Sequence, residues 1–400
     1  MARILMIAYT GYASDARVKR HAQALAGRGD EIDVICLCNE EEGLCGGVNV
    51  IGIDMPRYRG SNRISYLLSY LRFFVLAAWR GFRRALESPY DVAIACSMPD
   101  AAIICTLPLR LFGTRVLLDI HDTMPELYLD KRDGRGGELG AAMLRFEERV
   151  SAWFADHVLA VHELHRRRLE QVGIAANKIS VVLNAPDERI FKPKRQATGN
   201  HQDFTIVCHG TITKRLGIDV ALRALALLKD RLPEARLIVV GGGDFLSEAK
   251  GLAGKLGVEQ GVEFIPPVPV EQLPEIIQRG SIGLVPNHSS PATHLMLPVK
   301  LLEYGALGLP VIASRLRTIE HYFGEDAVRF FEPDNPAALA AAIAEIHDNP
   351  SMRWRMVKET RRTMELIDWR EERLHYFRAI DALLGSSVRA QEMSAADRRY

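Results

Sequence analysis

The stretch HLMLPVKLLEYGALGLPVIAS (294–314) predicts a helix that leads into a buried strand. Pro298 suits the first turn of a helix, because the N–H that proline lacks would have no partner there. The Gly-Leu-Pro that follows the helix ends it, and the apolar VIAS is typical of a buried strand. A helix start offers unpaired N–H groups and a positive dipole end, which together favour an anion. Because Lys300 and Glu303 lie within the first turns, we expect a ligand that carries both phosphate and sugar hydroxyls.

Length and composition limit the number of domains and the classes of protein to consider. Four hundred residues exceed what one hydrophobic core usually supports, so we expect two domains. The net charge of +1 argues against a nucleic-acid-binding protein. The six cysteines lie mostly in apolar runs and lack paired CxxC spacing, so we expect no metal site. Since the chain opens directly on a strand, Arg3–Ala8, we expect no signal peptide and a cytoplasmic location.

The order of predicted elements indicates an α/β protein built twice. Strands alternate with amphipathic helices in both halves, which is typical of doubly wound parallel sheets. The polar, proline-containing stretch 185–203 separates the halves and predicts a linker. We therefore place the first domain at 1–192 and the second at 203–368. The last helix, 369–385, either caps the second domain or crosses back to the first.

The segment 63–86 is strongly apolar and carries five arginines and no acidic residue. As a membrane span it is short, and Arg72 would cost about 2.5–3.5 kcal/mol at the bilayer centre. Two interpretations remain. In the first, the segment is an interfacial helix whose arginines bind anionic headgroups. In the second, it is a helix of the first domain whose apolar face is ordinary core.

In the second half, polar residues and glycines follow the predicted strands. Ligands of open α/β sheets bind beyond the carboxyl ends of the strands. Those ends carry His209–Thr211, Gly241–Asp244, Pro266–Val268 and Asn287-His288. Glycines allow backbone N–H groups to approach a phosphate closely. The basic pair Lys214-Arg215 follows the first of these turns, so we predict a diphosphate site.

In the first half, the run DIHDTMPE (119–126) follows an apolar strand and crowds polar side chains at its end. Because polar residues are crowded here, we expect His121 to have a functional role, with Asp122 and Glu126 beside it. The turn Thr10–Tyr12 ends the first strand at the same edge of the predicted sheet. Asp15 is either the N-cap of the first helix or a substrate contact.

Segments along the chain resemble retaining glycosyltransferases of family 4. Those that carry the likeness are YTGYASDARVKRHAQALAGRGDEIDVI, DIHDTMPE, ADHVLAVHELHRRRL, ISVVLNAPDERIFKP, HGTITKRLGIDVAL, LIVVGGGD, IGLVPN and LPVKLLEYGALGLPVIAS. They run in order from about residue 3 to 385. The resemblance implies the GT-B fold, in which two Rossmann-like domains face each other across a cleft and the last helix returns to the first domain. It also implies that the second domain binds a nucleotide-sugar donor and the first an acceptor.

The resemblance assigns roles residue by residue. Glu303 matches the glutamate that binds the donor ribose, and Arg215 with Lys214 matches the basic pair on the diphosphate. His121 matches the histidine near the transferred sugar, and Gly11 matches the loop near the diphosphate and the acceptor. The remaining donor-side positions that we assign are Gly210, Thr211, Gly242, Val268, His294, Leu295, Met296, Leu297 and Lys300; Tyr12, Asp122 and Glu126 are assigned to the acceptor side.

The sequence departs from the family at two places. Leu216 stands where many members carry the lysine of the basic pair. Leu295 stands where many carry a second glutamate, eight residues before Glu303, which binds sugar hydroxyls. His294 or the backbone amides of 295–297 are the substitutes that the sequence offers.

The resemblance thus implies a retaining glycosyltransferase that moves a sugar from a nucleotide-diphosphate sugar to a hydroxyl acceptor. We expect no cofactor and no metal, since no DxD-type aspartate pair lies at a strand end. Bacterial polysaccharide or lipid-linked glycan assembly is the favoured setting, at the inner face of the plasma membrane if 63–86 binds lipid. The alternatives are a secondary-metabolite glycosyltransferase, a nucleotide-sugar epimerase of the same fold and a non-enzymatic two-lobed sugar-binding protein.

Overall fold

The computed structural model describes residues 1–37, 42–56, 58, 63–97, 99–131, 137–193 and 204–385. The chain divides into two compact units. Unit 1 comprises Met1–Asn184 with Arg370–Tyr400, and unit 2 comprises Ala185–Trp369. Residues 194–203 of the predicted linker, and Cys38, lie outside the described residues.

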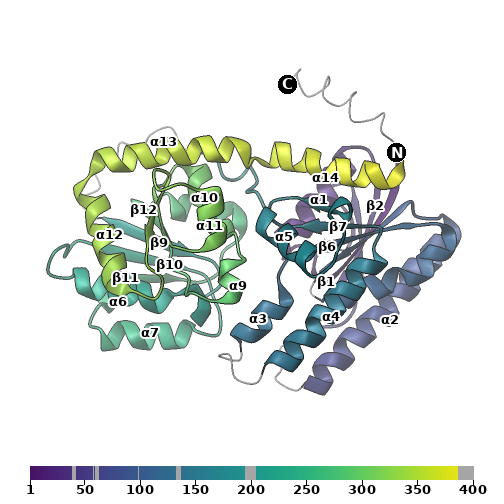
Figure 1. Ribbon diagram of the computed structural model, residues 1–400, viewed down its shortest axis with the longest axis horizontal. Helices are drawn as coiled ribbons and strands as arrows, with labels where there is room; N and C mark the ends of the chain where they lie inside the picture. Colours follow the sequence, from purple (N-terminus) through teal and green to yellow (C-terminus); the bar gives the residue numbers. More distant parts are fainter. Residues whose placement is uncertain are drawn as a thin grey trace. The chain divides into compact units, whose positions relative to one another are not determined.

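Within its described residues, unit 1 contains an eight-stranded sheet in the order β3-β4-β2-β1-β5-β6-β7-β8. Figure 1 labels β1, β2, β6 and β7 of this sheet. All neighbouring strands are parallel except β3 and β4. The strands are β1 (Arg3–Gly11), β2 (Glu31–Leu37), β3 (Gly43–Cys45), β4 (Val48–Ile53), β5 (Val92–Cys96), β6 (Arg115–Ile120), β7 (His157–Ala160) and β8 (Ile179–Val181). The helices are α1 (Ala16–Gly27), α2 (Arg63–Glu87), the 3-10 helix η1 (Asp100–Phe112), α3 (Met124–Asp130), α4 (Glu138–Phe154), α5 (Glu163–Gln171), the short η2 (Ala176–Lys178) and α14 (Trp369–Leu384).

The central strands of unit 1 are buried on both faces, so their sequences are continuous apolar runs. Alternate residues of β1 point into different helix layers. Ile4 and Met6 pack in a core that α1 and α14 cover. Leu5 and Ile7 pack in a core with residues of α2 and η1 on the opposite face. Residues of α4 extend that second layer over β6 and β7.

The last helix returns to unit 1, as the resemblance implies. Tyr376 and Ile380 of α14 are fully buried in the same core as β1. The Glu372 carboxylate accepts the Leu183 N–H at 2.7 Å, and Arg28 donates to Asp381 at 2.9 Å. Buried apolar contacts and polar bonds therefore join α14 to the first half of the chain.

Within its described residues, unit 2 contains a six-stranded, fully parallel sheet in the order β11-β10-β9-β12-β13-β14. The strands are β9 (Thr205–His209), β10 (Arg236–Val240), β11 (Val262–Ile265), β12 (Ile282–Val285), β13 (Val311–Ser314) and β14 (Val328–Phe331). The helices are η3 (Lys214–Leu216), α6 (Ile218–Leu228), α7 (Leu246–Lys255), η4 (Glu259–Gly261), η5 (Val270–Gln272), α8 (Leu273–Ile277), α9 (Pro291–His294), α10 (Val299–Leu307), α11 (Arg317–Tyr322), α12 (Pro336–Asp348) and α13 (Pro350–Leu366).

The first predicted strand, Arg3–Ala8, extends to Gly11 in the structure, and the structure adds several elements. The edge strands β3 and β14 are three and four residues long, too short to show a clear period. Pro108 interrupts the pattern of η1. Helix α10 begins one residue later than predicted, at Val299, because Pro298 keeps an extended ψ of 121° and forms the cap. Gly308, with a φ of 77°, ends α10 as expected.

Gly217 allows the turn after β9 to pack tightly against the turn after β12. Its φ is +72°, and a Cβ placed on it would lie 1.7 Å from the Pro286 carbonyl oxygen. Gly257 has a similar φ of +65°, but the nearest atom to a Cβ there is 3.9 Å away. Both glycines have a left-handed backbone, but only Gly217 is closely packed. Comparing their alanine variants therefore distinguishes backbone strain from overpacking.

Gly217→Ala is expected to lower the free energy of unfolding by about 3 kcal/mol, from left-handed strain and overpacking together. Gly257→Ala is expected to lower it by only about 1 kcal/mol, from strain alone. Urea denaturation followed by circular dichroism measures both variants. Equal losses would contradict the close packing of these two turns.

Candidate functional site

The turns after β9 and β10 lie against each other at the carboxyl edge of the unit 2 sheet. Ile212 N–H donates to the Gly242 carbonyl at 2.9 Å, and Phe245 N–H donates to the Ile212 carbonyl at 3.1 Å. A Cβ on Gly243 would lie 2.2 Å from the Ile212 oxygen. The glycine triplet therefore has a structural role, because it lets one turn lie on the other.

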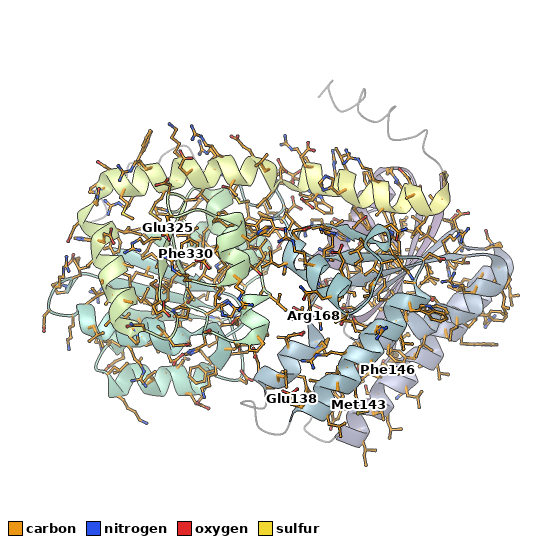
Figure 2. The ribbon with its side chains drawn as sticks, viewed as in Figure 1. Glu138, Met143, Phe146, Arg168, Glu325 and Phe330 are labelled. Atoms are coloured by element: carbon orange, nitrogen blue, oxygen red, sulfur yellow. The ribbon has the colours of Figure 1, made fainter. Side chains whose placement is uncertain are left out.

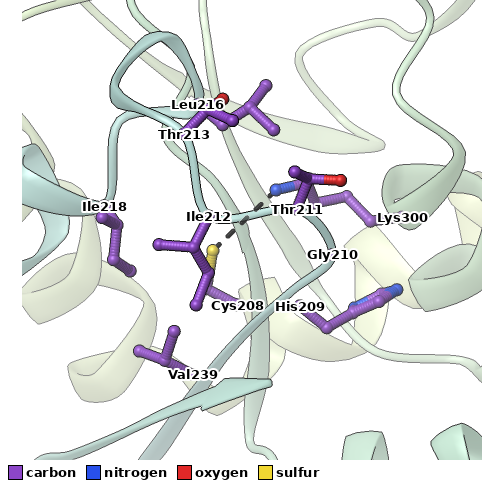
Figure 3. A pocket seen from close by; sticks show the side chains of 10 residues that line it. All are labelled: Cys208, His209, Gly210, Thr211, Ile212, Thr213, Leu216, Ile218, Val239 and Lys300. Carbon is purple, nitrogen blue, oxygen red and sulfur yellow. Dashed lines mark hydrogen bonds between the residues drawn. The ribbon is translucent and has the colours of Figure 1, made fainter. Parts of the chain in front are cut away.

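The turn after β9 and the side chain of Lys300 enclose a pocket (Figure 3). Lys300 extends from the first turn of α10, and its Nζ lies 3.9 Å from the Cys208 Sγ. Gly210 and Thr211, two of the predicted donor-side residues, line the pocket and are exposed. The full lining comprises Cys208, His209, Gly210, Thr211, Ile212, Thr213, Leu216, Ile218, Val239 and Lys300.

Arg215 lies next to the segment that leads into α10. Its guanidinium Nη1 is 3.7 Å from the Met296 Sδ, and its carbonyl accepts the His288 N–H at 3.0 Å. Lys214, by contrast, is exposed. Helix α10 has no side-chain N-cap hydrogen bond. The structure thus brings Arg215, Lys300 and the start of α10 to the same edge of the sheet.

Glu303 is held by a hydrogen-bond chain that begins at β9. Its Oε2 lies 2.5 Å from His209 Nε2, and His209 Nδ1 lies 2.9 Å from the Tyr304 hydroxyl. That hydroxyl also accepts the His209 N–H at 3.1 Å and donates to the Val207 carbonyl at 3.0 Å. Burial raises the pKa of Tyr304 well above its ordinary value, so the phenol keeps its proton. His209 therefore bridges the Tyr304 hydroxyl and the Glu303 carboxylate through its two ring nitrogens, which fixes the ring.

The segment that replaces the expected sugar-binding glutamate is already bonded within its own turn. The N–H groups of Leu295 and Met296 donate to the carbonyls of Ala292 and Thr293 at 3.0 and 3.3 Å. Two of the three amides that the sequence suggested as substitutes are therefore engaged in the turn that ends α9. Leu297 and Val268 are half-buried, and Gly242 lies in the turn described above.

His294 is fixed by two hydrogen bonds. Its Nδ1 accepts the Arg317 N–H at 3.2 Å, and its Nε2 lies 3.2 Å from the Ser289 hydroxyl. Burial, together with the charge of Arg317, lowers the pKa of His294, so the ring is neutral at pH 7. Its Nε2 then carries the proton, and its half-buried ring is held at the start of α11.

His288 connects three segments of unit 2. Its Nε2 lies 2.8 Å from Asp219 Oδ1 on α6, and its Nδ1 is bonded to Asp334 before α12. The hydrogen bond with Asp219 raises the pKa of His288, and burial opposes this while Asp334 adds to it. The charged imidazolium therefore stabilises the loop that Arg215 contacts.

In unit 1, Asp119 organises the carboxyl edge of the sheet. Arg17 binds both of its oxygens, at 2.8 and 3.1 Å, and His121 Nε2 lies 3.0 Å from Oδ2. Burial alone would raise the pKa of Asp119, but the charges of Arg17 and His121 outweigh it and hold the pKa well below its ordinary value. The carboxylate therefore accepts from His121 Nε2, and this contact orients the ring.

The neighbouring residues hold His121 at the ends of β5 and β6. The Ser97 Oγ accepts the His121 N–H at 3.0 Å. Cys96, Asp119 and His121 are grouped closely enough to hold a metal ion, with ligand atoms within 4.8 Å of one another. Both Asp119 oxygens are already bound by Arg17, and burial raises the pKa of the Cys96 thiol. This donor set suits a positioned histidine better than a metal, which needs a thiolate and a carboxylate that are free to coordinate.

Three further predicted residues of unit 1 lie at or near this edge. Gly11 ends β1, and Tyr12 is buried in the core that α1 and α14 cover. Asp122 is half-buried. Asp15 accepts the Val18 N–H at 3.1 Å, so the N-cap interpretation of this residue is confirmed.

Glu126 belongs to an internal ion network. Arg168 donates to Glu126 at 3.1 Å and to both oxygens of Glu148 at 2.6 and 2.7 Å. Burial raises the pKa of Glu148, although Arg168 opposes this. Glu126 therefore helps to hold α3 against α4 and α5, and its acceptor-side role stays a prediction.

Comparison with known proteins identifies the class. Residues 190–363 match the family described as glycosyl transferases group 1, and residues 14–185 match the glycosyl transferase 4-like domain. The D-inositol 3-phosphate glycosyltransferase of Streptomyces avermitilis is 31% identical over 347 residues, which cover 81% of this chain and 72% of that protein. The chain belongs to the GT-B glycosyltransferases, in the family 4-like group.

Other curated relatives match over shorter stretches. The amylovoran biosynthesis glycosyltransferase AmsK of Erwinia amylovora is 26% identical over 46% of either chain. In several such relatives the matched stretch spans about a third to about a half of their length.

Solved structures share the fold across nearly the whole chain. Sucrose-phosphate synthase from Thermosynechococcus elongatus superposes with a TM-score of 0.79 at 18% identity, over 97% of this chain and 100% of that chain. Anabaena Alr3699/HepE, solved in complex with UDP-glucose, superposes with a TM-score of 0.71 at 15% identity, over 96% and 100%. At these identities the likeness concerns the fold.

His209 is the residue to which sequence reasoning gave no role. The histidine was visible at the end of a predicted strand, but its partner lies on a helix 94 positions later. A polar residue that ends a buried strand, followed at once by a glycine turn, is the signal that could have found it.

The contribution of His288 to stability is expected to depend on pH. A pKa raised by folding gives stability that is complete below the unfolded pKa and is lost as pH rises through the folded pKa. The difference in melting temperature between the wild type and His288→Gln should therefore be largest at about pH 6 and shrink toward about pH 9. Differential scanning calorimetry at several pH values checks this. A difference in melting temperature that stays constant over that range would mean that the charge of His288 does not contribute to stability.

Proposed function

We propose that this chain transfers a sugar from a nucleotide-diphosphate sugar, bound by unit 2, to a hydroxyl acceptor bound by residues of unit 1. The observation that carries the proposal is the convergence of Arg215, Lys300 and Glu303 at the start of α10. Family membership and the UDP-glucose complex of the structural neighbour HepE support it. Glu303 accepts the ribose hydroxyls, while Arg215 and Lys300 face the diphosphate.

The leaving group determines what this site must supply. When the bond between the sugar and the diphosphate breaks, negative charge grows on the diphosphate and positive charge grows on the anomeric carbon. Cationic and N–H donors already in place stabilise that charge without further reorganisation. Arg215 offers a planar fork of donors, Lys300 offers a compact charge, and the start of α10 adds its dipole. We therefore propose that transfer needs no metal ion, and turnover that survives EDTA would support this.

The proposed stereochemical course is retention, by attack on the face that the leaving diphosphate occupies. The acceptor hydroxyl forms the new bond to the anomeric carbon as the bond to the diphosphate breaks, and its proton passes to a diphosphate oxygen. His121, oriented by Asp119, is proposed to contact the transferred sugar through Nδ1.

The relatives and the residues near α9 suggest an acceptor class and a contact for the transferred sugar. We propose an acceptor in polysaccharide or lipid-linked glycan assembly, in line with AmsK among the relatives. We propose that His294 takes the place of the missing sugar-binding glutamate, because its Nε2 faces the exposed Ser289 hydroxyl, which a sugar hydroxyl can replace, while the Leu295 and Met296 amides are engaged within their own turn. A neutral imidazole is a weaker and more selective partner for sugar hydroxyls than a carboxylate.

Arg215→Ala is expected to lower kcat about a hundredfold to a thousandfold with little effect on folding, because one donor to the leaving group is lost. Arg231→Ala is the matched control, since Arg231 lies exposed in the same unit and pairs with Asp348 at 2.7 Å. Its kcat should match the wild type. Nucleoside diphosphate release, with UDP- and GDP-sugars and with or without acceptor, is the assay, and NMR of the product reports the anomer.

Near-normal turnover of Arg215→Ala would contradict the assignment of this residue. Acceptor-independent epimerisation would identify a nucleotide-sugar epimerase instead. Donor binding without turnover under any acceptor would identify a sugar-binding protein. An inverted anomer would overturn retention but leave glycosyl transfer in place.

A further inference from the structure

Unit 1 carries a broad apolar surface on the side of its helix layer that faces away from the sheet. Helices α2 and α4 and the 3-10 helix η1 cover one face of the sheet, and η1 packs against both helices. Helices on the surface of a globular protein usually turn polar residues outward. Here all three elements turn large apolar residues outward as well as inward, so the layer carries hydrophobic side chains on both sides. We call this outward surface the apolar face.

Each element contributes a stripe at helical spacing. In α4, Leu139, Met143, Phe146, Val150 and Trp153 follow steps of three and four residues and are exposed. Figure 2 labels Met143 and Phe146 of this stripe. Ala141, Glu148 and Ala152 of the same helix are buried. The stripe is therefore distinct from the core-facing side of α4.

The other two elements repeat this arrangement. Helix α2 buries Phe73, Ala77 and Ala85, and η1 buries Cys105 and Leu109. Their outward residues include Ile64, Leu67, Leu68, Leu71, Val75, Trp79 and Leu86 of α2 and Ile104, Leu107 and Leu111 of η1, and all of them are exposed. Exposed apolar patches of this extent mark interaction sites.

The exposed basic residues of α2 and α4 outnumber their exposed carboxylates, Glu87 and Glu138. Arg72 and Arg83 of α2 and Arg149 of α4 are exposed, and Lys178 donates to the Trp153 carbonyl at 2.8 Å. Two of the three glutamates of α4 are turned inward. Glu147 accepts the Ala101 N–H at 2.7 Å, and Glu148 binds Arg168. An apolar surface bordered by arginine and lysine complements a lipid surface with anionic headgroups.

We propose that α2, η1 and α4 together dock unit 1 on the surface of an anionic bilayer. The helices lie in the headgroup region and do not cross it, since no described helix has the length and hydropathy of a membrane span. With 25 and 17 residues, α2 and α4 are helices about 37 and 25 Å long. Trp79 and Trp153 are suited to the interface between headgroups and acyl chains.

A second copy of the chain is a less fitting occupant. The segment 63–86 carries five arginines and no acid, so a two-fold interface through it would place arginines against arginines. The proposal combines both interpretations of 63–86, since it assigns one side of α2 to the core and the other side to lipid. This inference does not rest on the proposed glycosyl transfer.

Co-sedimentation of the full chain with vesicles tests the proposal. We expect binding to vesicles of phosphatidylcholine mixed with phosphatidylglycerol, and weaker binding as salt is raised. The triple variant Met143→Ser, Phe146→Ser and Trp153→Ser should lower the partition coefficient at least about tenfold. Arg149→Gln should lower it about fivefold on the anionic vesicles and leave binding to pure phosphatidylcholine unchanged.

A matched control is available in unit 2. Leu227, Trp354 and Leu366 are exposed apolar helix residues like those of the α4 stripe, with Trp354 63% exposed and Trp153 79%. Their triple serine variant should bind vesicles as the wild type does, and circular dichroism should show both triple variants folded.

Three results would overturn the proposal. The wild type could fail to sediment with either vesicle, or the control variant could lose as much binding as the α4 variant. Alternatively, the wild type could be a dimer without lipid that the α4 variant converts to monomer, while vesicle binding is absent. The last result would assign the apolar face to self-association.

Discussion

The hydrogen bond between His209 and Glu303 is the interaction on which the proposed donor site depends. It joins the end of a buried strand to the second turn of α10, and Tyr304 fixes the histidine from the other side. A free glutamate side chain would lose rotamer entropy on binding a ligand, whereas this one is already oriented. The same helix presents Lys300 and its own uncapped start, so one element supplies the carboxylate, a cation and a dipole.

Unit 1 uses a similar device with different residues. His121 follows a parallel strand and is oriented by a buried carboxylate, Asp119, which Arg17 neutralises. In both units a histidine at the carboxyl edge of a sheet gains a fixed ring from an acidic partner. The outer surface of α2, η1 and α4 differs from both sites, because large apolar side chains are exposed there.

The sequence predicted the elements that have strong periodicity, such as α10, α14 and most of the central strands, because burial on both faces leaves an apolar run. Local signals at helix starts and strand ends singled out Arg215, Lys300 and Glu303, whose roles stay predictions. It gave no role to His209 and did not reveal that the glycine triplet packs against another turn, since both depend on contacts distant in sequence. The exposure of the α4 stripe was also hidden, because periodicity cannot tell which side of a helix layer faces the core.

The most direct test of the central claim is titration calorimetry with UDP and GDP and with their 2′-deoxy analogues. If Glu303, held by His209, binds the ribose, the preferred ribonucleotide should bind the wild type about ten- to a hundredfold more tightly than its deoxy analogue. Glu303→Gln should lose most of that preference, and His209→Phe should reduce it. Equal affinity of the wild type for both sugars, or a preference that survives Glu303→Gln, would contradict this account of the site.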